Sequence, residues 1–183
     1  MKIVSGKLKF KNIFVLKKNI LRPTSLKLRL AIINILIHRF DWKDWHRNAS
    51  ILEPYAGTGS VSMEAISRGL MNCSLIEKDK EIFMSLKKNI KNLNLEAQTF
   101  LYNQDFLSFQ NLNKEYKIIF LDPPYKNKVL NLSIDKILDE KIAGKNTIII
   151  CESRKNHLFS NSILKKKVVS KDYGSLKLTF FLI

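Results

Sequence analysis

Short apolar runs alternate with segments of helical periodicity between residues 50 and 151. The predicted buried strands are Ile51–Leu52, Cys73–Ile76, Thr99–Tyr102, Ile118–Leu121 and Thr147–Cys151. Helices are predicted between them over about 60–67, 80–92 and 129–138, and Gly69 follows the first of these. The segments 167–170 and 176–182, with a turn at Tyr173-Gly174, are predicted to close the chain as an antiparallel hairpin. The expected fold class is α/β, a doubly wound, Rossmann-like sheet of five parallel strands plus this C-terminal hairpin.

The N-terminal part of the chain carries a different pattern. Residues 1–20 alternate apolar side chains with lysines, and Gly6 offers a turn, so a short basic β hairpin or arm is predicted. A helix should follow, with Thr24 or Ser25 as its N-cap and apolar positions at 26, 30, 33 and 37. We therefore expect an arm over residues 1–20 and a main domain over 21–183, forming a single domain overall.

Composition and charge narrow the class of partner. Hydrophobic residues make up 45% of the chain, which indicates a globular protein rather than a disordered one. The formal net charge of +16 favours a polyanionic partner such as nucleic acid. An AT-rich genome is an alternative source of this charge, because only 6 of the 32 cationic residues are arginine.

The apolar segments suggest neither a membrane anchor nor a metal site. The run 31–37 is interrupted by Asn34 and is far shorter than the roughly 20 residues that span a bilayer. The N-terminus does not resemble a signal peptide, so a cytoplasmic protein without a membrane partner is expected. Cys73 and Cys151 lie inside apolar runs without metal-ligand spacing, so we expect core residues and no metal.

The segment after the first predicted strand, Glu53-Pro-Tyr-Ala-Gly-Thr-Gly59, is a candidate ligand-binding turn. Two glycines spaced by one residue allow the backbone to approach a ligand closely. A dinucleotide fingerprint would have a third glycine where Ser62 stands. The acid before the glycines instead favours a ligand with a cationic amino group, such as the methionine part of S-adenosylmethionine. A purely structural turn is the alternative.

Two further acidic positions follow predicted strands. Glu77 ends the second strand, where such folds place a carboxylate for ribose hydroxyls, and Asp79 is a rival two residues later. Asp105, after the third strand, could accept a hydrogen bond from an adenine amino group, with Phe106 beside it. A turn cap is the alternative role for Asp105.

The fourth strand ends in Leu121-Asp-Pro-Pro-Tyr125, the most informative motif of the chain. Each proline lacks an N–H and restricts the backbone, so the carbonyls of Asp122 and Pro123 should point outward as acceptors. Together with the Asp122 carboxylate they could bind the two hydrogens of an exocyclic amino group. Tyr125 would offer a flat face on which a flipped base stacks. A simple strand terminator is the structural alternative.

These motifs together resemble the class I S-adenosylmethionine-dependent methyltransferases that modify amino groups. More narrowly, residues 1–183 resemble the RsmD family, the bacterial 16S rRNA guanine N2 methyltransferases. The matching segments are Leu21–Thr24, Arg29, Glu53–Gly69 with its Ser67-Arg68-Gly69 end, Leu75–Asp79, Asn103–Phe106 and Cys151–Ser153. The chain departs from the family at Leu26 and Leu30, where acids are common, and at Pro54-Tyr55, and it carries lysine in place of many arginines.

The resemblance implies methyl transfer from S-adenosylmethionine to the N2 atom of guanine 966 in 16S rRNA, free or in the small ribosomal subunit, by a monomer without a metal. The implied catalytic residues are Asp122, Pro123 and Tyr125. The implied cofactor-binding residues are Glu53, Tyr55, Gly57, Thr58, Gly59, Glu77, Asp105, Phe106 and Asp122. The expected RNA-binding residues are Lys7, Lys9, Lys11, Lys17, Lys18, Arg22 and Thr24.

Two other function classes stay open at this point. One is an amino-group methyltransferase acting on another RNA or on adenine or cytosine of DNA, although 183 residues leave little room for a separate DNA recognition domain. The other is a non-catalytic RNA-binding protein that retains the fold.

Overall fold

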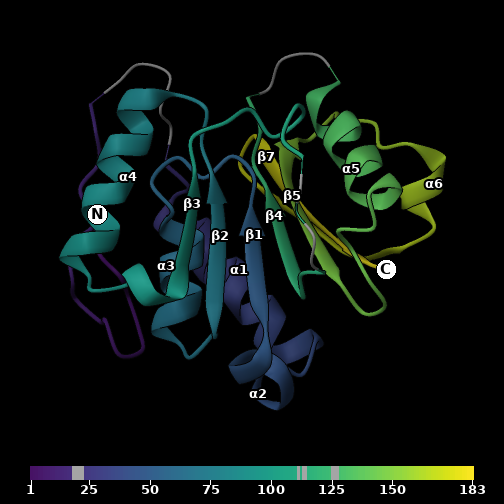
Figure 1. Cartoon of the computed structure of the whole chain (residues 1–183). Coiled ribbons are helices and arrows are strands. Elements are labelled where there is room, and N and C mark those ends of the chain that lie inside the picture. Colours follow the sequence, from purple (N-terminus) through teal and green to yellow (C-terminus); the bar gives the residue numbers. More distant parts are fainter. Residues whose placement is uncertain (18–22, 111, 113–114, 125–127) are drawn as a thin grey trace.

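A computed structural model of the chain describes residues 1–17, 23–110, 112, 115–124 and 128–183. These residues form one seven-stranded sheet with helices on both faces (Figure 1). The strands are β1 (Ser50–Glu53), β2 (Asn72–Ile76), β3 (Thr99–Tyr102), β4 (Ile118–Leu121), β5 (Ile148–Arg154), β6 (Lys167–Tyr173) and β7 (Leu176–Leu182). Their order in the sheet is β3-β2-β1-β4-β5-β7-β6.

The strand directions confirm the expected fold class. β1 to β5 are parallel to one another, whereas β7 is antiparallel to β5 and to β6. The expected crossover helices are present as α3 (Ser60–Ser67), α4 (Lys80–Asn92) and α5 (Val129–Asp139). The sequence pattern did not indicate α2 (Trp42–Trp45), α6 (Asn161–Leu164) or the 3-10 turns η1 (His46–Asn48) and η2 (Glu96–Gln98), because three or four residues show no measurable periodicity.

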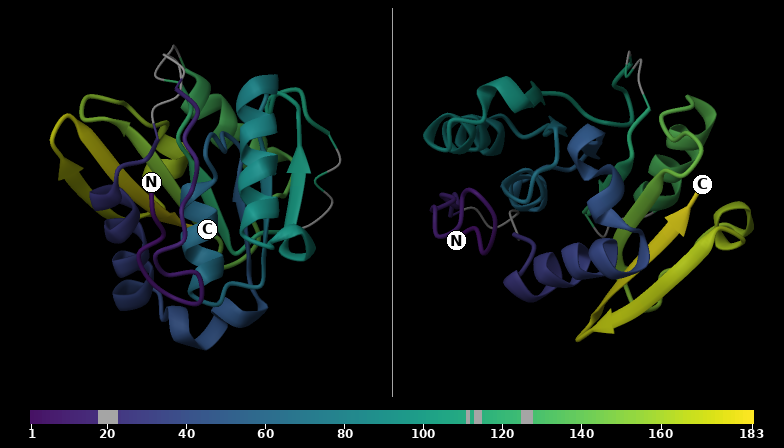
Figure 2. Two further views of the ribbon diagram at one scale, coloured as in Figure 1. Left: turned by 90° about the vertical axis from the view of Figure 1, so that its left-hand side faces the viewer. Right: turned by 90° about the horizontal axis from the view of Figure 1, so that it is seen from below.

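Alternating strand residues divide the core into two layers. Ile118 and Phe120 of β4 belong to the cluster packed with the N-terminal helix, α3 and α4, and Ile119 and Leu121 belong to the cluster on the α5 side. Figure 2 shows these helices on opposite faces of the sheet. Both faces are therefore covered, as a parallel sheet requires. No helix in the described part of the chain is long and apolar enough to cross a membrane.

The N-terminal helix α1 (Leu26–Arg39) begins at Ser25, whose hydroxyl accepts a hydrogen bond from Leu28 N at 3.3 Å. Of the apolar positions selected from the sequence, Ile33 is buried, whereas Leu26 is 50% exposed. The residues that α1 buries are Leu28, Arg29, Ile32, Ile33, Ile35 and Leu36. Apolar side chains surround most of this helix and the buried set includes a charged residue, so periodicity alone could not select the buried face.

The N-terminal arm is docked on the domain through its backbone. Among residues 1–17 the strand pairing is a single antiparallel bridge between Lys2 and Asn12. The expected β arm is therefore a loop with almost no strand pairing. Ile3 and Ile13 are buried in the α1-side core. The loop between them reaches Ser67, at the end of α3 and hence at the amino edge of the sheet (Figure 1).

Candidate active site

The chain changes its direction of winding between β1 and β4. From β1 it proceeds outward to β2 and β3, and then crosses back to place β4 on the other side of β1. In open α/β sheets, ligands bind beyond the carboxyl ends of the strands at such a point. The loops that follow β1 and β4 are the Glu53–Gly59 turn and the Asp122-Pro123-Pro124 segment. The fold thus brings together two motifs that are about 65 residues apart in the chain.

Glu53 ends β1 with its side chain buried. Its carboxylate accepts hydrogen bonds from the backbone N–H of Ser62, at 3.1 Å, and from the Ser62 hydroxyl. Burial raises the pKa of Glu53 to about 7, although the hydrogen bonds from Ser62 act in the opposite direction. In the sequence, Ser62 only argued against a dinucleotide site, and its hydrogen bonds to Glu53 were not predicted. A buried acid that titrates near neutrality is suited to pairing with a cationic group.

The glycine turn lies between Glu53 and α3. Gly57 and Gly59 both have positive φ, and Gly59 precedes the first residue of α3. A Cβ atom at Gly59 would lie 2.7 Å from Leu86 Cδ1, so the backbone packs too closely for a side chain there. Thr58 between the glycines is buried. The turn therefore has the tight backbone that the sequence predicts.

Glu77, at the end of β2, faces this turn. One carboxylate oxygen accepts a hydrogen bond from Gly57 N at 3.0 Å, and the other accepts one from Asp79 N at 2.9 Å. Burial is the main cause that raises its pKa. Asp79 instead caps α4, accepting hydrogen bonds from Glu81 N and Ile82 N at 3.0 Å each. Of these two acids, the geometry favours Glu77 as the one beside a ligand in the glycine turn.

Asp105 lies after β3 and is partly exposed. Its carboxylate accepts hydrogen bonds from Leu107 N at 3.0 Å and from Lys78 Nζ at 3.3 Å. The neighbouring Phe106 is 1% exposed, so its ring belongs to the core. A direct contact of either residue with a cofactor stays a prediction.

Tyr55 connects the glycine turn to α5. Its hydroxyl lies 2.7 Å from Ser133 Oγ, and its ring meets Phe106 edge-on with centroids 6.0 Å apart. Burial raises the pKa of Tyr55 to about 12, so the phenol stays protonated at neutral pH. This ring is half-buried, and a contact of Tyr55 with a cofactor stays a prediction.

The Asp122-Pro123-Pro124 segment begins where β4 stops pairing. The last residue pair between β4 and β5 is Leu121 with Cys151, whereas β5 continues to Arg154. Asp122 is half-buried, Pro123 is buried and Pro124 is exposed. Tyr125 lies outside the described residues.

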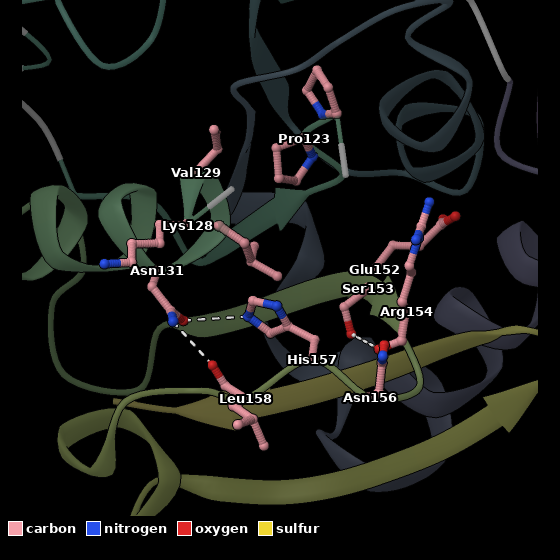
Figure 3. A pocket seen from close by; sticks show the side chains of 12 residues that line it. Pro123, Lys128, Val129, Asn131, Glu152, Ser153, Arg154, Asn156, His157 and Leu158 are labelled. Carbon is pink, nitrogen blue, oxygen red and sulfur yellow. Dashed lines mark hydrogen bonds between the residues drawn. The ribbon is translucent and has the colours of Figure 1, made fainter. Parts of the chain in front are cut away.

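A pocket of about 450 Å³ lies beyond the ends of β4 and β5. Figure 3 shows Pro123 on one side, the first turn of α5 on a second side and residues 152–157 on a third. The Asn131 amide donates a hydrogen bond to Leu158 O at 3.0 Å, and its oxygen lies 3.3 Å from His157 Nε2. Asn131, His157 and Leu158 were not predicted as site residues, because they come from a helix and a loop that no sequence motif connects.

The predicted RNA-binding residues are only partly described. Lys7, Lys9, Lys11 and Lys17 are exposed, and Lys7 Nζ donates a hydrogen bond to Gln98 Oε1 at 2.9 Å. Lys18 and Arg22 lie outside the described residues. Thr24, before α1, is 8% exposed, and its contact with RNA stays a prediction.

Comparison with known proteins finds matches over nearly the whole chain. A family model described as "Conserved hypothetical protein 95" matches residues 1–182. The chain is 33% identical over 183 residues to "Ribosomal RNA small subunit methyltransferase D" of Buchnera aphidicola subsp. Acyrthosiphon pisum, covering 92% of this chain and 88% of that protein. The chain belongs to the RsmD family of methyltransferases. A second RsmD-like relative, "Putative rRNA methyltransferase YlbH" of Bacillus subtilis, is 27% identical over 83% of this chain and 82% of its own length.

Solved structures share the RsmD fold. "Putative methyltransferase yhhF from Escherichia coli" superimposes with a TM-score of 0.83 at 21% identity, covering 100% of this chain and 97% of that one. An RNA methyltransferase from Salinibacter ruber in complex with S-adenosyl-L-homocysteine gives a TM-score of 0.65 at 15% identity, covering 88% and 94%. At these identities the likeness establishes the Rossmann-like methyltransferase fold.

Proposed function

We propose that this RsmD-family protein transfers a methyl group from S-adenosylmethionine to the exocyclic N2 of a guanine in 16S rRNA, of the guanine 966 type. The observation that carries the proposal is the meeting of the Glu53–Gly59 turn and the Asp122-Pro123-Pro124 segment at the switch point between β1 and β4. The relatives named as small-subunit rRNA methyltransferases support the choice of RNA as substrate.

The residues around the glycine turn fit S-adenosylmethionine. Glu53 supplies a buried carboxylate for the ammonium group of the methionine part, and Glu77 supplies acceptors for the two ribose hydroxyls. Gly57 and Gly59 both have positive φ, and the tight turn that they allow leads the backbone into the start of α3. When bound, the cofactor supplies an electrophilic methyl group on a sulfonium.

Asp122 and Pro123 would position the amino group that receives the methyl. The Asp122 carboxylate and the Pro123 carbonyl accept its two N–H hydrogens, which directs the nitrogen lone pair toward the methyl group. No base needs to remove a proton beforehand, because the nitrogen becomes positively charged on transfer and then loses a proton. Positioning therefore accounts for most of the expected rate acceleration.

The pocket beyond β4 and β5 is the candidate binding site for the flipped guanine. It adjoins Pro123, and its volume of about 450 Å³ is in the range of small-molecule sites. Lys128 and Arg154 are exposed lining residues on different segments of its wall, where they could contact the phosphates beside the flipped nucleotide (Figure 3).

The test is methylation of small ribosomal subunits that lack the modification, with labelled S-adenosylmethionine, followed by mapping of the methylated base. The expected product is N2-methylguanine. Asp122→Ala should abolish transfer while calorimetry shows cofactor affinity within a few-fold of the unmodified protein. Equal loss of both would make Asp122 mainly a cofactor ligand, and a methylated adenine or cytosine would contradict the assigned substrate.

A further inference from the structure

Two phenylalanines on the N-terminal arm are strongly exposed. The ring of Phe10 is 68% exposed and that of Phe14 is 58% exposed. Among the large apolar side chains of the described residues, only Leu158 is more exposed than these two. Neither ring gains much folding stability from burial, so its presence on the arm needs another explanation.

The backbone conformation of Phe10 also indicates a role other than folding. Phe10 has φ +69°, a left-handed conformation that is unfavourable for a residue with a bulky side chain. Hydrogen bonds on each side of the residue, from Phe10 N to Ile3 O and from Lys11 N to Leu8 O, hold this turn in place. Glycine would suit this position better as far as folding is concerned. The chain instead presents an aromatic ring there.

Both phenylalanines sit next to firmly anchored backbone. Leu8 N donates to Ser67 Oγ at 2.9 Å, just before Phe10. Phe14 N and Phe14 O both bond to the side chain of Asn89, a buried residue of α4, at 2.8 Å. The rings are thus held on a preordered segment, which lowers the entropy lost when they bind a partner.

Lysines alternate with these rings. The arm reads Lys7-Leu-Lys9-Phe10-Lys11, and Lys9 Nζ lies 4.7 Å from the centre of the Phe10 ring. Aromatic rings interleaved with cations match single-stranded nucleic acid, in which bases stack on the rings while phosphates meet the cations. The net charge of +16 makes an acidic polymer the complementary partner.

We propose that Phe10 and Phe14 form a stacking platform for unpaired RNA bases, separate from the site that receives the target guanine. The loop carrying Phe10 contacts Ser67 at the amino edge of the sheet, whereas the candidate active site lies at the carboxyl edge (Figure 1). The platform therefore binds a part of the RNA remote from the methylated base. This inference rests on the proposed RNA substrate and specifies how a second part of that RNA is recognised.

The experiment compares variants of the full chain in fluorescence anisotropy with two probes, a labelled unpaired oligoadenylate and a fully paired RNA duplex. Phe10→Gly should bind the unpaired RNA about tenfold more weakly, the loss expected for one base stack, and the duplex nearly as well as before. Because glycine tolerates φ +69°, this variant should keep or gain thermal stability, so the weaker binding cannot come from unfolding. Phe14→Ala should weaken binding by a similar factor.

Phe100→Ala is the matched control, since Phe100 is a 48% exposed phenylalanine on β3, outside the arm. It should leave both affinities unchanged. The platform is refuted if Phe10→Gly binds unpaired RNA like the unmodified protein, if both probes weaken equally, or if the rings prove necessary only for binding a purified ribosomal protein.

A methyl-transfer assay on small subunits distinguishes a failure of the stacking platform from a failure of the proposed function. If the unmodified protein binds unpaired RNA through Phe10 but transfers no methyl group, the proposed activity fails and the platform stands. If methyl transfer occurs with the same KM in Phe10→Gly, the platform fails and the activity stands.

Discussion

At the scale of single residues, the environment of Glu53 determines its chemistry. A carboxyl group in water has a pKa near 4.5, whereas burial raises that of Glu53 to about 7. Between these values the folded protein holds a proton that the unfolded chain releases. The contribution of Glu53 to the free energy of unfolding is therefore fully present below about pH 4.5 and is lost as the pH rises toward 7. An ammonium group bound beside Glu53 would favour the ionised form and reverse this loss.

We expect S-adenosylmethionine to bind more weakly below pH 7, by up to about tenfold for each pH unit, because protonated Glu53 cannot pair with the ammonium. At pH 6 binding should release close to one proton. Calorimetry in two buffers of different ionisation enthalpy measures this release. Glu53→Gln, which is nearly the same size, should bind weakly at every pH and release no proton through this site. Identical proton release in both proteins would contradict the assignment.

Two of the positive-φ glycines, Gly59 and Gly174, allow the cost of backbone strain to be measured separately from the cost of close packing. Gly59→Ala places a Cβ atom 2.7 Å from Leu86 Cδ1 at φ +68°, and should lower the free energy of unfolding by about 2 kcal/mol. Gly174→Ala meets nothing within 4 Å at φ +62°, so about 1 kcal/mol of strain is expected. Urea unfolding of both variants measures the difference. Equal losses would mean that the close contact between Leu86 and the glycine turn does not affect the free energy of unfolding.

At the scale of elements, a buried carboxylate of α3 helps to attach the arm, together with the contacts to Ser67 and Asn89. Glu64 is fully buried and accepts hydrogen bonds from Val4 N at 2.9 Å and Ser5 N at 3.2 Å. It also forms ion pairs with Arg68 at 3.0 Å and with the buried Arg29 at 3.7 Å. Arg29 in turn donates to the carbonyl of Lys2. A local run of lysines and apolar residues thus owes part of its defined position to charges contributed by two helices.

Glu64→Ala should destabilise the fold by about 3 kcal/mol, because it leaves a buried arginine and two backbone N–H groups without their acceptor. The control is Glu140→Ala, which removes an ion pair with Lys136 from a side chain that is 42% exposed, and it should cost less than about 0.5 kcal/mol. Urea unfolding compares the two, and limited proteolysis should show earlier cleavage within residues 1–17 in the first variant only. Similar stability of both variants would exclude the anchoring role of Glu64.

At the scale of the whole molecule, the positive charge is distributed over both ends of the sheet. The exposed lysines of the arm lie on the β3 side in Figure 1, and Lys165, Lys166 and Lys167 lie on the β6 side. Only the first group adjoins the proposed stacking platform. Net charge alone would make the two groups equivalent in RNA binding, whereas the fold predicts that they differ.

RNA affinity should fall steeply with salt. If Lys7, Lys9, Lys11 and Lys17 each neutralise one phosphate of a single strand, they contribute about 3 to the slope of log Kd against log salt concentration. Replacing Lys7, Lys9 and Lys11 with glutamine should lower the slope by about 2. The same replacement of Lys165, Lys166 and Lys167 should change it little. Equal changes in the two triple variants would point to nonspecific attraction by total charge.

The sequence by itself determined the succession of the seven strands and the crossover helices, the parallel sheet, and the place of Glu53, the glycine turn and the Asp-Pro-Pro segment at the ends of their strands. These features depend on local properties such as periodicity, missing N–H groups and backbone freedom at glycine, which a linear pattern records. The tertiary structure alone decided the hydrogen bonds of Glu77 to the glycine turn and of Asp79 to α4, the buried side of α1 and the support of Glu53 by Ser62. It also decided the burial of Phe106 and Thr24 and the pocket between residues 123 and 158. Each of these depends on which distant segments meet in space, and the local pattern does not contain that information.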